Sequence, residues 1–171
     1  WFPITAKKNL RAQEIAMESH IPIIYLVDSA GVFLPLQEDI FPDKEHFGRI
    51  FRNNAKMSSM GIPQIAAIMG PCVAGGAYLP IMSDEALIVE GEGSVFLAGS
   101  HLVRAAIGEV IDNESLGGAK VQSNISGVTD YVMKNDEECI AQIRSLVEKF
   151  GSNEKAGFDR SESKLPKYPT K

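Results

Sequence analysis

The chain has 171 residues, with 17 Lys and Arg against 22 Asp and Glu, a formal net charge of -5. This length fits one domain of ordinary size, and 44% hydrophobic with 23% charged residues excludes an intrinsically disordered chain. The acidic balance argues against nucleic acid or an anionic membrane as the main partner, because neutralising phosphates requires clustered Lys and Arg.

The two cysteines, Cys72 and Cys139, are far apart and match neither a disulfide framework nor the spacing of metal ligands. We therefore expect a reducing intracellular environment and no metal site. No apolar run reaches the roughly 18–20 residues that cross a bilayer, so no membrane segment is expected. The chain begins at Trp1 without an initiator Met or a leader, which suggests processing or a piece of a longer protein.

The first predicted elements are a helix and a strand. Thr5 is a candidate cap for a helix that ends near His20. The apolar run 21–27 is rich in β-branched residues and too short for a buried helix, so it predicts a strand buried on both faces. The run ends at 28–31, Asp-Ser-Ala-Gly, and a helix followed by such a strand implies a parallel sheet.

The same helix and strand pattern then recurs. A second helix is predicted from Pro42 toward Gly61, followed by a second buried strand over 62–69. The strand is expected to stop at the glycine-rich segment 70–76, which leads into a short helix over 77–82. The repetition reinforces the prediction of a parallel α/β sheet.

The rest of the chain predicts shorter elements. These are strands over 86–89 and 94–97, helices over 101–107 and 114–117, and a strand near 128–132. Asn135 is expected to cap an amphipathic helix that ends near Phe150 and carries one apolar stripe of Ile140, Ile143, Leu146 and Val147. Residues 151–171 are polar and predict a linker or tail.

Two glycine-containing turns are the first indication of a site. Sites in open parallel sheets lie at the carboxyl ends of strands, where this chain has the turns 28–31 and 74–77. Glycines allow backbone N–H groups to face outward, and the second turn also opens a helix, whose N-terminus favours negative charge. Together the turns can stabilise an anion such as an enolate oxygen. The alternative is that these glycines only permit tight turns and close packing.

Side chains suited to catalysis are scarce. A hydrolase triad of Ser29, His46 and Asp28 lacks the G-x-S-x-G turn that exposes a serine nucleophile. His46 either pairs with Asp43 or contacts a ligand. Cys72 is more typical of a small buried residue than of a nucleophile.

Phosphate-binding signals are also weak. Neither predicted strand is followed by GxGxxG or by the Walker lysine. Lys7, Lys8 and Arg11 form the one compact basic group of the folded part. They either contact the phosphates of a ligand such as coenzyme A or form a solvated charged face.

One segment resembles a known family. Residues 62–65 followed by 70–85, GPCVAGGAYLPIMSDE, are similar to the core motif of the carboxyltransferase subunits of biotin-dependent acyl-CoA carboxylases, in the crotonase-like superfamily. The following segments resemble the methylcrotonoyl-CoA carboxylase β branch of that family: 10–16, 25–29, 41–43, 46–49, 96–99, 116–119 and 126–128. Together they cover nearly all of residues 3–150.

The resemblance implies an α/β fold of crotonase type, a ββα superhelix. Residues 1–150 would be a partial N-terminal carboxyltransferase lobe, and 151–171 a linker toward a C-terminal lobe that is absent here. The implied reaction moves a carboxyl group from carboxybiotin to an acyl-CoA, such as 3-methylcrotonyl-CoA or a related branched or unsaturated thioester. The freed ureido nitrogen takes the proton from the acyl carbon, so no side-chain base is needed.

The resemblance also implies the site residues. The backbone N–H groups of Gly75, Gly76, Ala30 and Gly31 correspond to the hole that holds the enolate oxygen. Contacts to the substrate are expected from the following residues: Lys7, Lys8, Arg11, Ser29, Cys72, Ala74, Ala77 and Tyr78.

The family further implies partners and a compartment. Biotin is carried by a biotin carboxylase and biotin carrier α subunit, and the site is shared between subunits of a homo-oligomer. The implied location is the cytoplasm in bacteria and the mitochondrial matrix in eukaryotes. Without a second lobe, the chain alone is expected to be inactive.

Several positions bear on alternatives. Hydratases of the superfamily carry a glutamate three residues beyond the oxyanion glycine, where this chain has Tyr78, so hydration is disfavoured. Ala30 stands where relatives usually have glycine and would narrow the turn if its φ were positive. Gln122 replaces a frequent His and Leu36 a frequent Arg.

Two other functions remain open for this chain. One is an acyl-CoA decarboxylase α subunit that runs the transfer in reverse, and the other is a non-catalytic CoA-binding or assembly module.

Overall fold

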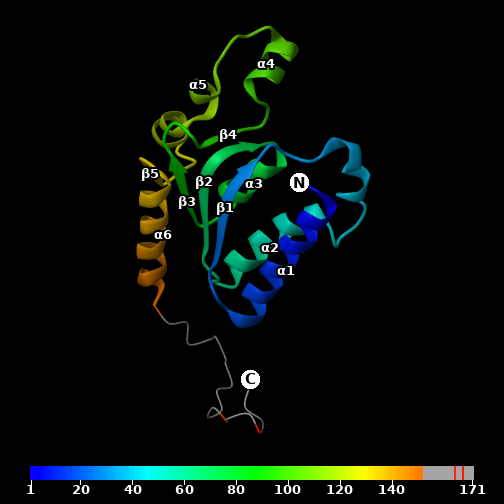
Figure 1. Ribbon diagram of the computed structural model, residues 1–171, viewed down its shortest axis with the longest axis vertical. Helices are drawn as coiled ribbons and strands as arrows, with labels where there is room; N and C mark the ends of the chain where they lie inside the picture. Colours follow the sequence, from blue (N-terminus) through cyan, green and yellow to red (C-terminus); the bar gives the residue numbers. More distant parts are fainter. Residues whose placement is uncertain (152–163, 165–166, 168–171) are drawn as a thin grey trace.

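A parallel sheet with β2 at its centre forms the core of the fold (Figure 1). The computed structural model describes residues 1–151, 164 and 167. Its strands are β1 (Ile23–Ser29), β2 (Gln64–Val73), β3 (Glu85–Val89), β4 (Ser94–Phe96) and β5 (Tyr131–Met133). The order is β1-β2-β3-β5, with β4 paired to β2, and every pairing between strands is parallel. The predicted parallel α/β architecture is confirmed.

β2 changes neighbours along its length. Residues 65–68 lie between β1 and β3, whereas 71–73 pair with β4. The β1–β2 register shifts as well, so that Val27 faces Ile68 but Ser29 faces Cys72. The prediction that this strand stops at the glycine-rich segment was wrong, because pairing with β4 carries it on to Val73.

The prediction that the first strand is buried on both faces was also wrong. Burial alternates along β1, where Ile23, Tyr25 and Val27 are buried but Ile24 is 42% and Leu26 61% exposed. β1 is an edge strand of the sheet within the described residues. An apolar run specifies a strand here, but only neighbouring elements decide how many of its faces are covered.

The helices α1 (Pro3–Ser19) and α2 (Phe47–Ser59) pack together on one side of the sheet (Figure 1). α1 begins before Thr5, which caps it from inside by accepting the Phe2 N–H at 3.2 Å. α2 begins after the predicted Pro42, because the residues before it form turns in which Asp43 Oδ1 accepts the Glu45 N–H at 2.7 Å.

The remaining elements lie close to their predicted positions. α3 (Gly75–Ile81) begins at the glycines, followed by α4 (Ser100–Ile107), α5 (Asn113–Gly117) and α6 (Asp136–Phe150). Asn135 caps α6 as predicted, with its Oδ1 accepting the Glu138 N–H at 2.9 Å. A 3-10 helix over Leu34–Asp39 and a π-helical turn over Val121–Ile125 were not predicted. The predicted tail over 151–171 lies almost entirely outside the described residues.

Two apolar clusters lie on opposite faces of the sheet. Ala66 and Ile68 of β2 belong to the cluster that contains Phe47 of α2, and Ile65 and Ala67 to the cluster under α6. α6 contributes Cys139, Ile143 and Leu146 to that second cluster, while Ile140 of the predicted stripe is 40% exposed. Alternate β2 residues thus face opposite layers, as expected for a central parallel strand.

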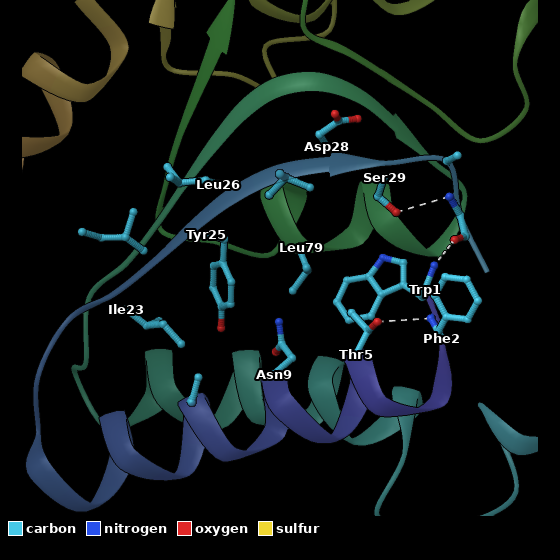
Figure 2. Close-up of a pocket in the computed structure, with 15 residues that line it drawn as sticks. Trp1, Phe2, Thr5, Asn9, Ile23, Tyr25, Leu26, Asp28, Ser29 and Leu79 are labelled. Atoms are coloured by element: carbon cyan, nitrogen blue, oxygen red, sulfur yellow. Dashed lines mark hydrogen bonds between the residues drawn. The ribbon is translucent and has the colours of Figure 1, made fainter. Parts of the chain in front are cut away.

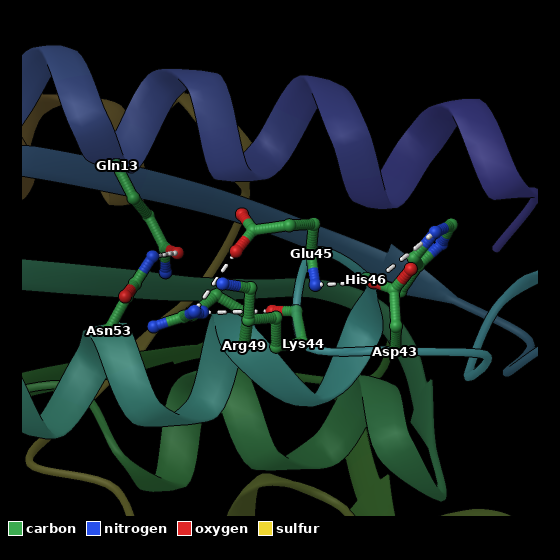
Figure 3. A network of polar contacts seen from close by, with 7 residues as sticks. All are labelled: Gln13, Asp43, Lys44, Glu45, His46, Arg49 and Asn53. Atoms are coloured by element: carbon green, nitrogen blue, oxygen red, sulfur yellow. Dashed lines mark hydrogen bonds and ion pairs between the residues drawn. The ribbon is translucent and has the colours of Figure 1, made fainter.

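A buried amide network joins α1 to α2 and β1. Gln13 Nε2 donates to the Tyr25 hydroxyl at 3.0 Å and to the Ile50 carbonyl at 3.3 Å. Asn53 Nδ2 donates to Gln13 Oε1 at 3.1 Å (Figure 3). Because unpaired buried polar groups are costly, these bonds specify how the two helices align.

No helix in the described ranges is long and apolar enough to span a membrane.

Candidate functional site

The structure brings the two glycine-containing turns into contact. Of the predicted turns 28–31 and 74–77, we call residues 29–31 at the end of β1 the first turn and residues 74–76 at the start of α3 the second turn. A Cβ atom built on Gly76 would lie 2.5 Å from Ser29 Oγ, and one built on Gly31 would lie 3.7 Å from the Val73 carbonyl oxygen. The extension of β2 past its glycine places the second turn beside the first.

The first turn is set by Gly31 and Ser29. Gly31 has φ +93, whereas Ala30 does not have a positive φ, so alanine is accommodated there. The Gly31 N–H donates to Ser29 Oγ at 3.2 Å. Ala30 is exposed, and its N–H has no acceptor among the residues that the structure describes.

The second turn has an unusual backbone at Ala74, with φ 51 and ψ -119. The Ala74 N–H donates to the Phe96 carbonyl of β4 at 3.2 Å. The next N–H groups, of Gly75 and Gly76, have no acceptor within the described part of the chain. A Cβ on Gly75 would lie 2.6 Å from Phe47 Cε1. Close packing therefore requires these glycines, and the same turn also leaves two N–H groups without an acceptor, on the half-buried Gly75 and the buried Gly76.

A cavity of about 490 Å³ opens beside the first turn (Figure 2). Trp1, Asn9, β1, the first turn and Leu79 of α3 line it. The Asn9 Oδ1 atom is buried without a hydrogen-bond partner among the described residues. Sequence reasoning missed Asn9, although its position four residues before Gln13 places both amides on one face of α1.

The basic group lies outside this cavity. Lys7, Lys8 and Arg11 are exposed on α1, and none of them lines the cavity. Arg11 Nη1 is paired with Glu14 Oε2 at 3.0 Å. Of the three cations, Arg11 is therefore already partly neutralised.

Cys72 lies in the core. It is fully buried, and its thiol donates to the carbonyls of Val27 and Gly70, both at 3.6 Å. Burial, with a smaller effect from the charge of Asp28, raises the pKa of the Cys72 thiol to about 12. The thiol is thus protonated and enclosed, which disfavours a nucleophilic role.

Two more predicted contact residues lie on α3. Ala77 is 4% exposed and Tyr78 is 47% exposed. The Tyr78 ring packs against Phe51, with ring centroids 5.2 Å apart. Tyr78 is therefore accessible from solvent near the second turn, whereas Ala77 packs inward.

His46 faces Asp43, one of its two expected roles. The His46 Nε2 and Asp43 Oδ1 atoms are 3.8 Å apart (Figure 3). Arg49 is held nearby, donating to the Lys44 carbonyl at 2.8 Å and to Glu45 at 3.0 Å. No group of three metal-ligating side chains occurs in the described ranges. The two turns therefore present backbone N–H groups, and Asp28, which also lines the cavity, is the carboxylate next to the first turn.

The family model for the carboxyl transferase domain matches residues 1–171. The chain is 53% identical over 169 residues to the biotin-dependent 3-methylcrotonyl-coenzyme A carboxylase beta1 subunit of Mycobacterium tuberculosis, covering 99% of this chain and 32% of that protein. It is 53% identical over 170 residues to the mitochondrial methylcrotonoyl-CoA carboxylase beta chain of Dictyostelium discoideum, covering 99% of this chain and 29% of that protein.

A solved structure shows the same fold. The beta subunit of geranyl-CoA carboxylase from P. aeruginosa matches with a TM-score of 0.81 and 35% identity, over 98% of this chain and 30% of that one. The expected crotonase-like architecture agrees with this similarity. The chain spans about a third of the length of the curated relatives that it matches.

Proposed function

This chain belongs to the carboxyl transferase domain family, and on that premise we propose that it forms part of a subunit that transfers a carboxyl group from biotin to an acyl-CoA. The preferred acyl group is 3-methylcrotonyl or a related branched or unsaturated chain, in keeping with the names of its relatives. The observation that carries the proposal is the pair of adjoining turns with N–H groups that have no acceptor within the described residues.

The turns act on the thioester carbonyl of the substrate. Loss of a proton from the acyl carbon gives an enolate, whose oxygen takes up negative charge. The N–H groups of Ala30, Gly75 and Gly76 donate to this oxygen in our proposal. Donors that are held in place before the reaction stabilise the negatively charged oxygen more than they stabilise the neutral carbonyl of the bound substrate. One such donor increases kcat by a factor of roughly 10²–10³.

The chain itself supplies no side-chain base in this scheme. When bound, carboxybiotin supplies the carboxyl group and the ureido nitrogen that accepts the proton. The surroundings of the turns fit this role, since Cys72 is buried and protonated, and His46 faces Asp43. Tyr78, at the position of a hydratase glutamate, is no carboxylate. The chain's contribution is positioning of the thioester and stabilisation of the oxyanion.

The remaining substrate contacts follow from exposure. The exposed ring of Tyr78 is available to the acyl group, and Ala74 contributes through the second turn, whereas the buried Ala77 supports that turn from the core. Lys7 and Lys8 are the proposed contacts for the phosphates of coenzyme A, because Arg11 is already paired with Glu14. Cys72 supports the site from the core.

The assembly is also part of the proposal. The relatives are β subunits of carboxylases by name, and the one from Mycobacterium tuberculosis is named biotin-dependent. We therefore assign biotin to a separate biotin carboxylase and carrier α subunit, and the complete site to a homo-oligomer of the full-length protein. The corresponding compartment is the mitochondrial matrix in a eukaryote and the cytoplasm in a bacterium.

Carboxylation of acyl-CoA thioesters tests the function. The full-length protein with its biotin-carrying partner, ATP and labelled bicarbonate is expected to label 3-methylcrotonyl-CoA or a related thioester in a panel. Labelling of none of them contradicts the proposal. ATP-independent loss of the carboxyl group from a carboxylated acyl-CoA to biotin would instead support a decarboxylase.

A titration with coenzyme A separates a substrate site from an assembly module. Gly75→Val adds a branched side chain where even a Cβ would overlap Phe47, so it should weaken CoA binding or abolish activity. Gly48→Ala is the control, because no atom lies within 4 Å of its added Cβ. Equal CoA binding and equal activity of the Gly75→Val variant and wild type would favour an assembly role.

A further inference from the structure

Ser29 lies where the two turns meet. Its Oγ accepts the Gly31 N–H of the first turn at 3.2 Å. On the other side, a Cβ built on Gly76 would lie 2.5 Å from Ser29 Oγ and 2.7 Å from Ser29 Cβ. The serine side chain therefore occupies the space that a side chain at Gly76 would need, and it contacts both turns at once.

This placement depends on the irregular pairing of β1 with β2. The register shift after Val27 sets Ser29 opposite Cys72, next to the end of β2. The shift also brings Asp28 against Gly70, where an added Cβ would lie 2.6 Å from the Asp28 Cγ. Packing on both strands thus holds Ser29 at the junction.

The hydrogen bond also distinguishes the donors of the first turn. The Gly31 N–H is already bonded to Ser29 Oγ, so it is not free for a substrate oxygen. The Ala30 N–H has no acceptor within the described ranges, and Ala30 is exposed. Ala30 is thus the donor that the first turn presents.

We infer that Ser29 is a positioning residue. It holds the first turn through its hydrogen bond with Gly31 and sets the distance between this turn and Gly76. As a result, the Ala30 N–H and the N–H groups of the second turn converge on one oxygen. This inference rests on the proposed function and deepens it. Ser29 does not act as a nucleophile here, because its hydroxyl has no base as a partner in the described part of the chain and accepts only the Gly31 N–H.

The test compares two serine variants of the full-length protein assembled with its biotin-carrying partner. Ser29→Ala removes the acceptor of the Gly31 N–H and keeps Cβ. Ser59→Ala is the matched control, because among the described residues the Ser59 hydroxyl bonds only its own helix, donating to the Lys56 carbonyl at 2.7 Å. Steady-state carboxylation of an acyl-CoA, thermal unfolding and amide hydrogen exchange over residues 29–33 are measured for both.

Ser29→Ala is expected to lower kcat about tenfold or more, while KM for the acyl-CoA changes less than about threefold. The reason is that a misplaced N–H donor reduces the stabilisation of the transition state more than it reduces binding of the substrate. Amide exchange over 29–33 should be faster, while the melting temperature stays near that of wild type. Ser59→Ala should match wild type in all three. If Ser29→Ala does not fold, Ser29→Cys replaces it, because sulfur keeps the volume but accepts weakly.

Other outcomes overturn the inference in distinguishable ways. An unchanged kcat in Ser29→Ala, with an active wild type, overturns the positioning role and leaves the proposed function standing. A raised KM with unchanged kcat shows that Ser29 binds substrate directly, which also overturns it. A wild type that carboxylates no acyl-CoA rejects the proposed function and the catalytic role of Ser29 with it.

Discussion

Replacing Gly76 by alanine is the most direct perturbation of the contact between the two turns. The added Cβ would lie 2.5 Å from Ser29 Oγ and 2.7 Å from Ser29 Cβ, whereas ordinary contacts begin at 3.4 Å. The serine cannot turn away without losing the bond from the Gly31 N–H. Overpacking of this kind costs about 1–3 kcal/mol and a lost hydrogen bond about 1 kcal/mol. Gly76→Ala should therefore lower the free energy of unfolding by about 2–4 kcal/mol.

Urea unfolding followed by circular dichroism measures this change. Ser29→Gly removes both atoms that the new Cβ meets, so the double variant should recover at least half of the loss, a coupling that independent sites do not show. Gly48→Ala should be as stable as wild type or slightly more, since no atom lies within 4 Å of its added Cβ. The contact is refuted if Gly76→Ala unfolds like wild type, or if adding Ser29→Gly destabilises it further.

Ala74→Gly should raise the free energy of unfolding by about 1 kcal/mol. The backbone angles of Ala74, φ 51 and ψ -119, strain an alanine by ~1–3 kcal/mol, whereas glycine costs only ~0.5–1 kcal/mol in additional chain entropy. A variant that is less stable than wild type in urea would contradict this. Gln13→Leu should lower the free energy of unfolding by about 2–4 kcal/mol in the same assay, since the Tyr25 hydroxyl and the Asn53 amide lose their buried partner. A variant with the stability of wild type would show that the network contributes little. The pKa of Cys72 is raised to about 12 in the folded state, so folding favours the protonated thiol. The contribution of this thiol to the free energy of unfolding is complete below about pH 9 and is lost toward pH 12, by up to ~1.4 kcal/mol per pH unit. Cys72→Ala should lose less stability than wild type between pH 9 and 10, and equal slopes would refute the assignment.

The sequence was sufficient for the architecture because its apolar runs and glycines are local signals. The run 62–69 predicted a strand buried on both faces, and β2 is such a strand. The similar run 21–27 predicted the same for β1, yet Ile24 and Leu26 are exposed. Both runs carry the same pattern, and the difference lies in what covers each face, which a single strand's sequence does not encode.

The candidate site was predicted in part for the same reason. The turns after both strands could be located from their glycines, and the structure brings them into contact. The choice of donor in the first turn could not be predicted, since it depends on the hydrogen bond that the Gly31 N–H donates to Ser29 Oγ. The role of Ser29 also depends on the register shift after Val27, which arises from pairing between segments distant in sequence.

The vibrational frequency of the thioester carbonyl tests the central claim most directly. The full-length protein would be mixed with an acyl-CoA that is labelled with ¹³C at the thioester carbon, and the C=O stretch of the bound substrate recorded by isotope-edited infrared difference spectroscopy. Donation from Ala30, Gly75 and Gly76 should lower the stretching frequency relative to free substrate, and Gly75→Val should reduce or abolish the shift. A bound thioester with the frequency of the free one would contradict the claim that these turns hold the carbonyl oxygen.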